Sequence, residues 1–256
     1  MILLSFDIEE FDMPLEYGQS LSFDDQLHIS ATGTIAVLNL LKKHNVKATF
    51  FCTANFALNK KDILRLIVDD GHEIASHGYY HSDFKPEHLA SSKNVLEELT
   101  NQKVNGYRMA RMMPFDESLL SKSGYSYNSS LNPTYLPGRY NNFTKPRTHF
   151  QQHDITQLPA SVTPLVRLPL FWLSFHNLPQ WFYKKCCQWT LITDGYLNIY
   201  FHPWEFTDLS NMNFFPAYVR RNSGDKMIRR MDNFISWAKN KNFEFVRSHD
   251  FVNTIK

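Results

Sequence analysis

Cysteine is scarce in this chain, which has only Cys52, Cys186 and Cys187 among its 256 residues. The number is odd and two of the three are adjacent, so they form neither a disulfide framework nor the spacing of a zinc site. An excess of charge of one sign is also missing. The 27 basic residues nearly balance the 25 acidic ones, the net charge is +2, and there is no basic block. We therefore expect no nucleic acid partner.

Long apolar runs are absent as well. The chain opens directly on Ile2-Leu3-Leu4-Ser5-Phe6 and has no stretch suited to a signal peptide or a transmembrane helix. Together with the reducing compartment that the cysteines favour, this predicts a cytoplasmic location. A chain with 43% apolar residues can bury a large core. No linker, repeat or low-complexity tract divides it, so we expect one domain over residues 1–256.

Segments with strand character alternate with segments of helical periodicity along most of the chain. Strands are expected at residues 2–7, 46–51, 73–75, 104–107, 197–202 and 243–246. Helices are expected at residues 30–44, 60–69, 86–101 and 223–241, the first of them with Ser30 as its N-cap. Repeated βα units imply a parallel sheet, and about seven of them predict an α/β barrel or a doubly wound sheet.

Polar side chains follow the expected strands at the edge where parallel sheets carry functional residues. Asp7 ends the first strand, and Glu9 lies on the same side if the chain stays extended. His77 and His81 follow the third strand, and His202 ends a late one. Two imidazoles and one carboxylate can bind a metal ion and leave positions open for water and substrate. Each residue alone is more often a cap or a structural side chain, but together they predict a hydrolytic metal site.

Several segments, in the same order, resemble the motifs of the polysaccharide deacetylase, or NodB-homology, family of carbohydrate esterases. The resemblance covers nearly the whole chain, from Leu4 to about Phe245. The matching segments are Leu4-Ser-Phe-Asp-Ile-Glu-Glu, Gly71-His-Glu-Ile-Ala-Ser followed by His77-Gly-Tyr-Tyr-His81, Gly106-Tyr-Arg108, Gly124-Tyr-Ser-Tyr-Asn-Ser-Ser and Leu197-Asn-Ile-Tyr-Phe-His202-Pro-Trp-Glu. The segment with the two histidines is the strongest single match.

The resemblance implies a distorted (β/α) barrel of about seven strands. It also implies the removal of an N-acyl group, such as N-acetyl, from a sugar with the help of one divalent metal ion. Asp7 would be the general base, Arg108 the residue that steadies Asp7, and His202 the general acid. His77 and His81 would bind the metal together with a carboxylate. Zinc is the expected metal, and cobalt, nickel, manganese or iron fit the same ligands.

The first motif departs from the family pattern. The usual pair of adjacent aspartates is replaced by Asp7-Ile8-Glu9-Glu10, so the metal carboxylate must be a glutamate. Strand alternation favours Glu9, with Glu10 as the alternative. The proline usual after the third-motif arginine is missing in Arg108-Met109-Ala110-Arg111, and Asn128 stands where relatives commonly carry aspartate. The base, the histidine pair and the acid are all retained.

The expected substrate is an N-acylated sugar in a glycan. For a cytoplasmic chain, a lipid-linked or nucleotide-linked intermediate is more reasonable than finished wall polymer. Two alternatives stay open. One is a hydrolase of cyclic amides on the same fold, which in some relatives needs no metal. The other is a glycan-binding relative with impaired catalysis.

Residues 165–192 are unusually rich in aromatic side chains and carry Lys184 and Lys185 beside them. A buried helix and the segment leading into it explain this composition most simply. The alternative is an apolar surface with a basic edge that makes peripheral contact with a membrane.

Overall fold

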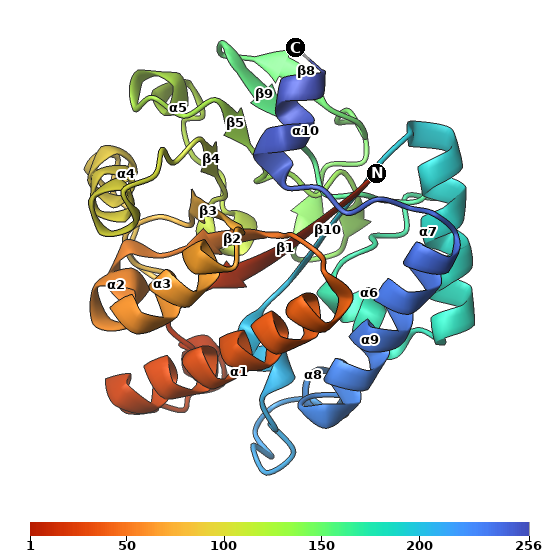
Figure 1. Cartoon of the computed structure of the whole chain (residues 1–256), viewed down its shortest axis with the longest axis horizontal. Helices are drawn as coiled ribbons and strands as arrows, with labels where there is room; N and C mark the ends of the chain where they lie inside the picture. Colours follow the sequence, from red (N-terminus) through yellow and green to blue (C-terminus); the bar gives the residue numbers. More distant parts are fainter. Residues whose placement is uncertain (256) are drawn as a thin grey trace.

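A curled half-barrel of eight strands forms the centre of the computed structural model, which describes residues 1–255 (Figure 1). The strands are β1 (Ile2–Ile8), β2 (Thr49–Cys52), β3 (Glu73–Ser76), β4 (Gly106–Tyr107), β5 (Tyr127–Asn128), β8 (Phe150–Gln152), β9 (Ile155–Gln157) and β10 (Leu197–Phe201). Their order is β10-β1-β2-β3-β4-β5-β9-β8, and all neighbours are parallel except β8, which runs antiparallel to β9 at the edge. The α/β barrel expected from the motifs is confirmed, with β8 as an additional edge strand.

Most of the helices cover the outer side of this sheet, whereas α10 (Ser248–Thr254) packs on the inner-facing side chains Leu3, Phe51 and Ala75 (Figure 1). The other helices are α1 (Phe23–His44), α2 (Ala54–Asn59), α3 (Lys61–Asp69), α4 (Glu87–Thr100), α5 (Ser118–Lys122), α6 (Trp172–Asn177), α7 (Gln180–Asp194), α8 (Ala217–Arg220) and α9 (Asp225–Asn240). Short 3-10 helices are η1 (Met13–Tyr17), η2 (Ala110–Met112) and η3 (Pro203–Phe206), and β6 (Tyr135–Leu136) pairs with β7 (Tyr140–Asn141) as a separate hairpin. Within residues 1–255, no helix is both long enough and apolar enough to cross a membrane.

The first helix begins earlier than its apolar periodicity predicts. Its N-cap is Ser22, whose hydroxyl accepts a hydrogen bond from the Asp25 amide at 3.1 Å, so the expectation that Ser30 caps the helix is wrong. Ser30 lies buried within α1 and donates to the main-chain oxygen of Glu9 at 2.7 Å. Its hydroxyl therefore fixes the segment that follows β1 instead of the helix start.

The strand expected at residues 243–246 is also wrong. Phe245 forms only an isolated bridge to Ile2, supported by hydrogen bonds from the Ile2 amide to Glu244 and from the Val246 amide back to Ile2. The chain turns into α10 directly afterwards, so the extended stretch is too short to continue the sheet.

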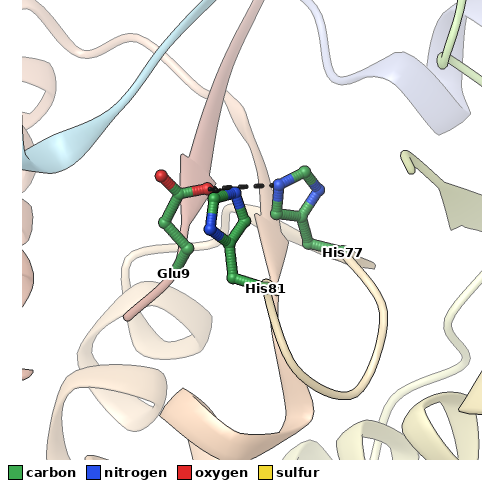
Figure 2. Close-up of side chains that lie close together, drawn as sticks. All are labelled: Glu9, His77 and His81. Atoms are coloured by element: carbon green, nitrogen blue, oxygen red, sulfur yellow. Dashed lines mark ion pairs between the residues drawn. The ribbon is translucent and has the colours of Figure 1, made fainter. Parts of the chain in front are cut away.

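The carboxyl ends of β1 and β3 lead directly to the predicted site residues. Glu9 follows β1, while His77 and His81 follow β3 on the other side of β2, and the three side chains meet (Figure 2). Because all these strands are parallel, their carboxyl ends lie at one edge of the half-barrel. The sheet thus brings together residues that are far apart in the sequence.

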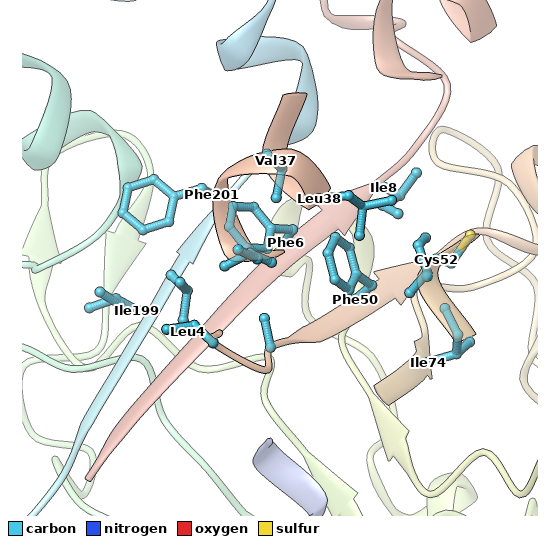
Figure 3. Packing of buried hydrophobic residues seen from close by; sticks show 14 of the residues in the cluster. Leu4, Phe6, Ile8, Val37, Leu38, Phe50, Cys52, Ile74, Ile199 and Phe201 are labelled. Carbon is cyan, nitrogen blue, oxygen red and sulfur yellow. The ribbon is translucent and has the colours of Figure 1, made fainter. Parts of the chain in front are cut away.

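Side-chain alternation along β1 separates the core from the site. Leu4, Phe6 and Ile8 point to the outer side, where they pack with residues of β2 and α1 such as Phe50 and Val37 (Figure 3). The intervening residues lie on the inner side, and all of β1 is buried. Asp7 is the last inward-facing residue of the strand, which is why an ionisable group can lie at the end of a hydrophobic run.

Close packing of α1 against η3 depends on Gly33. A Cβ atom at this position would lie 1.9 Å from the carbonyl oxygen of Pro203, a main-chain atom that cannot swing aside. Because η3 directly follows His202, the glycine also sets the position of the segment that carries this histidine.

Replacing Gly33 with alanine tests this contact. In an ordinary helix interior the change would stabilise the protein by about 0.5–1 kcal/mol. Here we expect it to lower the free energy of unfolding by about 1–3 kcal/mol, because the helix must move away. Denaturant titration measures the change, and Thr32→Ala, on the exposed side of α1, is the matched control with little expected effect. A Gly33→Ala protein as stable as the parent would contradict the close contact.

Candidate active site

Three buried side chains offer a metal-ligand set at the edge of the half-barrel. Glu9 Oε2 lies 2.7 Å from His81 Nε2 and 3.3 Å from His77 Nε2 (Figure 2). All three ligand atoms lie within 4.8 Å of one another, and each residue is buried. Two imidazole nitrogens and one carboxylate oxygen are a donor set that zinc and similar divalent ions accept.

Hydrogen bonds fix both imidazoles in the orientation that a metal site requires. His77 Nδ1 lies 2.9 Å from the carbonyl oxygen of Arg108, and His81 Nδ1 lies 2.7 Å from Asp12 Oδ1. A carbonyl and a carboxylate only accept, so each Nδ1 carries a proton. Each Nε2 therefore faces Glu9 and is the nitrogen available to bind a metal ion, as is typical of metal-binding histidines.

The charges of this cluster depend on one another. Burial disfavours a charged ring at His81, but the carboxylates of Glu9 and Asp12 on its two sides raise its pKa well above the usual value. Burial would likewise raise the pKa of Glu9, but the two histidines lower it well below the usual value. A proton and a metal ion thus compete for His81 Nε2, so metal binding here releases a proton.

The structure distinguishes the two glutamates that the first motif leaves open. Glu9 Oε1 accepts a hydrogen bond from Trp204 Nε1 at 3.1 Å, while its Oε2 faces the rings of His77 and His81 and has no further partner within residues 1–255. Glu10 turns away and accepts hydrogen bonds from Thr53 and Asn55, and burial raises its pKa. Glu9, not Glu10, therefore lies with the histidine pair.

Asp7 and Arg108 form a buried ion pair on the inner side of the barrel. Arg108 Nη1 lies 2.5 Å from Asp7 Oδ1, and neither side chain has more than 3% of its surface exposed. The guanidinium group also donates to the hydroxyl of Ser5 and to the hydroxyl and carbonyl oxygens of Ser129. Arg108 is therefore fixed in place and holds the carboxylate of Asp7 toward the pocket.

His202 is supported from behind by a buried carboxylate. Its Nδ1 lies 3.0 Å from Glu205 Oε1, and the other oxygen of Glu205 lies 2.8 Å from His176 Nε2. Burial lowers the pKa of His202, but the hydrogen bond to Glu205 and the negative charges of Glu9 and Glu205 outweigh it and raise the pKa. The ring of Trp204 stacks on His202, with centroids 4.9 Å apart. His202 is therefore held as a proton donor with its Nε2 free.

A single pocket of about 500 Å³ brings all of these groups together. Its lining includes Asp7, Glu9, His77, His81 and His202, as the sequence predicted. Its walls and mouth carry aromatic rings and two arginines, and this lining comprises Tyr17, Arg111, Arg139, Tyr140, Phe171, Trp172, Tyr200, Trp204 and Tyr218. Such rings suit the faces of a sugar. Polar groups in the centre and aromatic rings around them fit a carbohydrate pocket.

Three supporting residues were not predicted as part of the site: Asp12, His176 and Glu205. Trp204 was expected in the core more than against a sugar ring, and both Trp204 and Glu205 lie in the last matching segment, directly after His202. Asp12 follows three other acidic residues closely, and no spacing distinguishes it from them. His176 comes from α6, and nothing in the sequence links it to the last motif.

Arg111 also reaches the site. It pairs with Asp12 at 3.0 Å and with Glu16, and its backbone has a positive φ of 56°. Asn128, which stands in place of a common aspartate, donates to Gln157 at 2.9 Å and is not among the residues that line the pocket. The replacement of aspartate at 128 therefore leaves the pocket groups in place.

The amino-acid sequence is similar to those of known polysaccharide deacetylases. A model of the polysaccharide deacetylase family matches residues 18–112. The peptidoglycan deacetylase of Helicobacter pylori is 28% identical over 188 residues, which cover 66% of this chain and 64% of that protein. The chain thus spans less than two thirds of the length of the curated relatives it matches.

Solved structures share the fold across almost the whole chain. The probable polysaccharide deacetylase of Pseudomonas aeruginosa PAO1 has a TM-score of 0.68 at 19% identity, covering 98% of this chain and 89% of that one. Puue allantoinase has a TM-score of 0.66 at 18% identity, covering 98% and 88%. At these identities the likeness concerns the fold alone. The family model and the Helicobacter pylori relative confirm the resemblance seen in the motifs: the chain is similar to proteins of the polysaccharide deacetylase family.

Proposed function

We propose that the protein is a metal-dependent deacetylase that hydrolyses the N-acetyl group of a sugar in a glycan. One observation carries the proposal. The His77–His81–Glu9 donor set, the ion-paired Asp7 and the supported His202 all face one pocket. The activity of the Helicobacter pylori relative, a peptidoglycan deacetylase, supports the same chemistry.

Each side chain has a defined task in this reaction. A bound divalent ion would lower the pKa of a water molecule and polarise the acyl carbonyl. Asp7 accepts the proton of the attacking water, with Arg108 holding its carboxylate in position. His202 donates a proton to the sugar nitrogen, which leaves as an amine only once it is protonated. Glu205 keeps the ring of His202 oriented and stabilises its charged form.

The substrate that we propose is a lipid-linked or nucleotide-linked intermediate, consistent with our proposal of a cytoplasmic location. The pocket walls offer tyrosine and tryptophan rings on which a sugar can stack, and Arg139 stands at the mouth without a carboxylate partner among residues 1–255. A cation at this place suits a phosphate or carboxylate group next to the N-acetyl sugar. Zinc is the metal that we propose for the centre.

Substituting the two adjacent glutamates separately tests the metal centre. We expect Glu9→Gln to weaken zinc binding by at least about 100-fold, because it removes a ligand's charge. Glu10→Gln is the matched control and should bind zinc nearly as the parent does. The carboxylate of Glu10 accepts hydrogen bonds from Thr53 and Asn55 instead of facing the histidine pair. Competition with a chromogenic chelator measures both affinities. The reverse order of effects would show that the ligand assignment is wrong.

Asp7→Asn separates the base from the metal ligands. The amide cannot accept a proton from water, so we expect kcat for acetate release to fall by about 10²–10⁴-fold. Zinc content should stay at the parent level, because Asp7 is not one of the three clustered ligands. Acetate release at the parent rate by the zinc-loaded variant would contradict the role of Asp7.

Glu205→Gln tests how His202 works as the acid. His202 must be protonated to act, so activity falls as the pH rises through its pKa. Removing the charge of Glu205 lowers that pKa, and the alkaline limb of the kcat/KM profile should therefore move to lower pH. Asp208→Asn, an exposed carboxylate three residues further on, is the control and should leave the limb in place. An unmoved limb in Glu205→Gln would argue against His202 as the acid.

A further inference from the structure

A row of exposed side chains runs along the outer side of α7, at the right-hand edge of Figure 1. We call it the α7 outer face and define it as Trp181, Lys185, Trp189 and Ile192. The spacing of four, four and three residues places these side chains on one stripe of the helix. Trp181 is 63% exposed, Trp189 41% and Ile192 75%. Nothing within residues 1–255 covers them, so the explanation by a buried helix fails for this side.

The opposite side of the same helix accounts for the buried part of the pattern. Tyr183, Cys187 and Leu191 are buried and belong to the main hydrophobic core. The helix therefore needs only one of its two apolar sides to fold. The exposed tryptophans contribute little to the core and call for a separate explanation.

Positive charge accompanies the exposed rings. Lys185 Nζ lies 5.4 Å from the centre of the Trp181 ring, and Lys184 Nζ lies 6.0 Å from that of Trp237. Between Glu117 and Asp194 the sequence has one acidic residue, Asp154. The basic residues in this interval are Lys122, Arg139, Lys145, Arg147, Arg167, Lys184 and Lys185. Asp194 itself pairs with Arg147, which leaves the cations of α7 without a neighbouring carboxylate on that helix.

A second exposed apolar pair lies in the loop that precedes α6. Leu165 and Val166 are 82% and 70% exposed. The next residue, Arg167, donates to the carbonyl oxygen of Lys145 at 2.8 Å, and Arg147, two residues after Lys145, donates to Asp194 at 2.6 Å. The segment 145–147 thus links this loop to the last residue of α7.

We propose that the α7 outer face rests on an anionic lipid surface. Tryptophan rings beside lysines are the composition of helices that lie in the membrane interface, where the rings enter the headgroup region and the lysines meet anionic lipids. If two copies associated through this face, their lysines would come close together and repel one another. A single convex helix also offers no groove for a peptide. A flat anionic surface satisfies both the apolar and the charged groups.

The N-terminal end of this face lies near the pocket mouth. Trp172 and Leu173 of α6 line the pocket, as does Tyr218, whose carbonyl oxygen accepts a hydrogen bond from Asn177 at 2.9 Å. α7 begins three residues after Asn177, so Trp181 is only four residues along the chain from this side of the pocket. If the proposed deacetylase function holds, on which this step rests, the contact would present a lipid-linked glycan to the site.

Co-sedimentation of the full chain with vesicles tests the contact. We expect binding at low salt to phosphatidylcholine vesicles that contain phosphatidylglycerol, and much weaker binding to phosphatidylcholine alone or at high salt. The double variant Trp181→Ser with Trp189→Ser should lower binding at least about tenfold. Lys184→Gln with Lys185→Gln should lower it by about fivefold for each lysine at low salt.

A matched control carries exposed apolar residues from another part of the surface. Ile35→Ser with Leu66→Ser changes side chains that are 43% and 47% exposed on α1 and α3, and it should bind vesicles as the parent does. The proposal is overturned if the parent does not bind anionic vesicles at low salt, or if both α7 variants bind as well as the parent. It is also overturned if sedimentation shows a dimer that the tryptophan variant dissociates.

Turnover of a soluble N-acetylated oligosaccharide in the same preparations separates this proposal from the proposed function. The α7 variants should keep the parent rate, because none of the changed side chains lines the pocket. Vesicle binding without any turnover in the zinc-loaded parent would contradict the deacetylase function and support the lipid contact. Turnover without vesicle binding would support the function and contradict the contact.

Discussion

The buried contact network of Arg108 joins the two halves of the candidate site. Its guanidinium group holds Asp7, the proposed base, and its main-chain carbonyl oxygen fixes His77, a proposed metal ligand. Each of its three nitrogens donates a hydrogen bond, and the side chain is fully buried, with 4.0 Å from the guanidinium carbon to the centre of the Phe51 ring. Removing one partner of such a pair leaves an uncompensated buried charge, at a cost of about 3–5 kcal/mol. Arg108, the residue that directly follows β4, therefore sets the distance between the base and the metal ligands.

Trp204 links the metal ligands to the acid in a similar way. Its indole N–H holds one oxygen of Glu9, and its ring stacks on His202. Glu9 is left with a single free oxygen, which is the one directed at the histidines. The extra methylene of glutamate relative to aspartate lets the chain reach this position from the residue after Ile8. The hydrogen bond from Trp204 then fixes the longer side chain.

The sequence predicted those parts of the structure that depend on local pattern. The mostly apolar residues 2–6 indicated the first buried strand, and strand alternation placed Glu9 on the same side as Asp7. Because parallel strands place their carboxyl ends at one edge, the meeting of Glu9 with the histidine pair followed from the order of the elements. The start of α1 was missed because its first turns carry polar residues. The expected strand at 243–246 failed because the sequence pattern does not reveal that the chain turns into α10 after a single bridge to Ile2.

The supporting residues could not be predicted for a different reason. Asp12 and His176 act through contacts between segments distant in the chain, with 69 residues separating Asp12 from His81 and 29 separating His176 from Glu205. Local periodicity carries no information about such pairs. The exposure of side chains is equally hard to predict from the sequence. The aromatic residues of α7 fit a core helix by composition, and only the packing shows that one side of the helix remains uncovered. Where a helix has more apolar surface than its core contact can use, the surplus points to a partner outside the fold. The lysines beside the α7 tryptophans indicate that this partner is negatively charged.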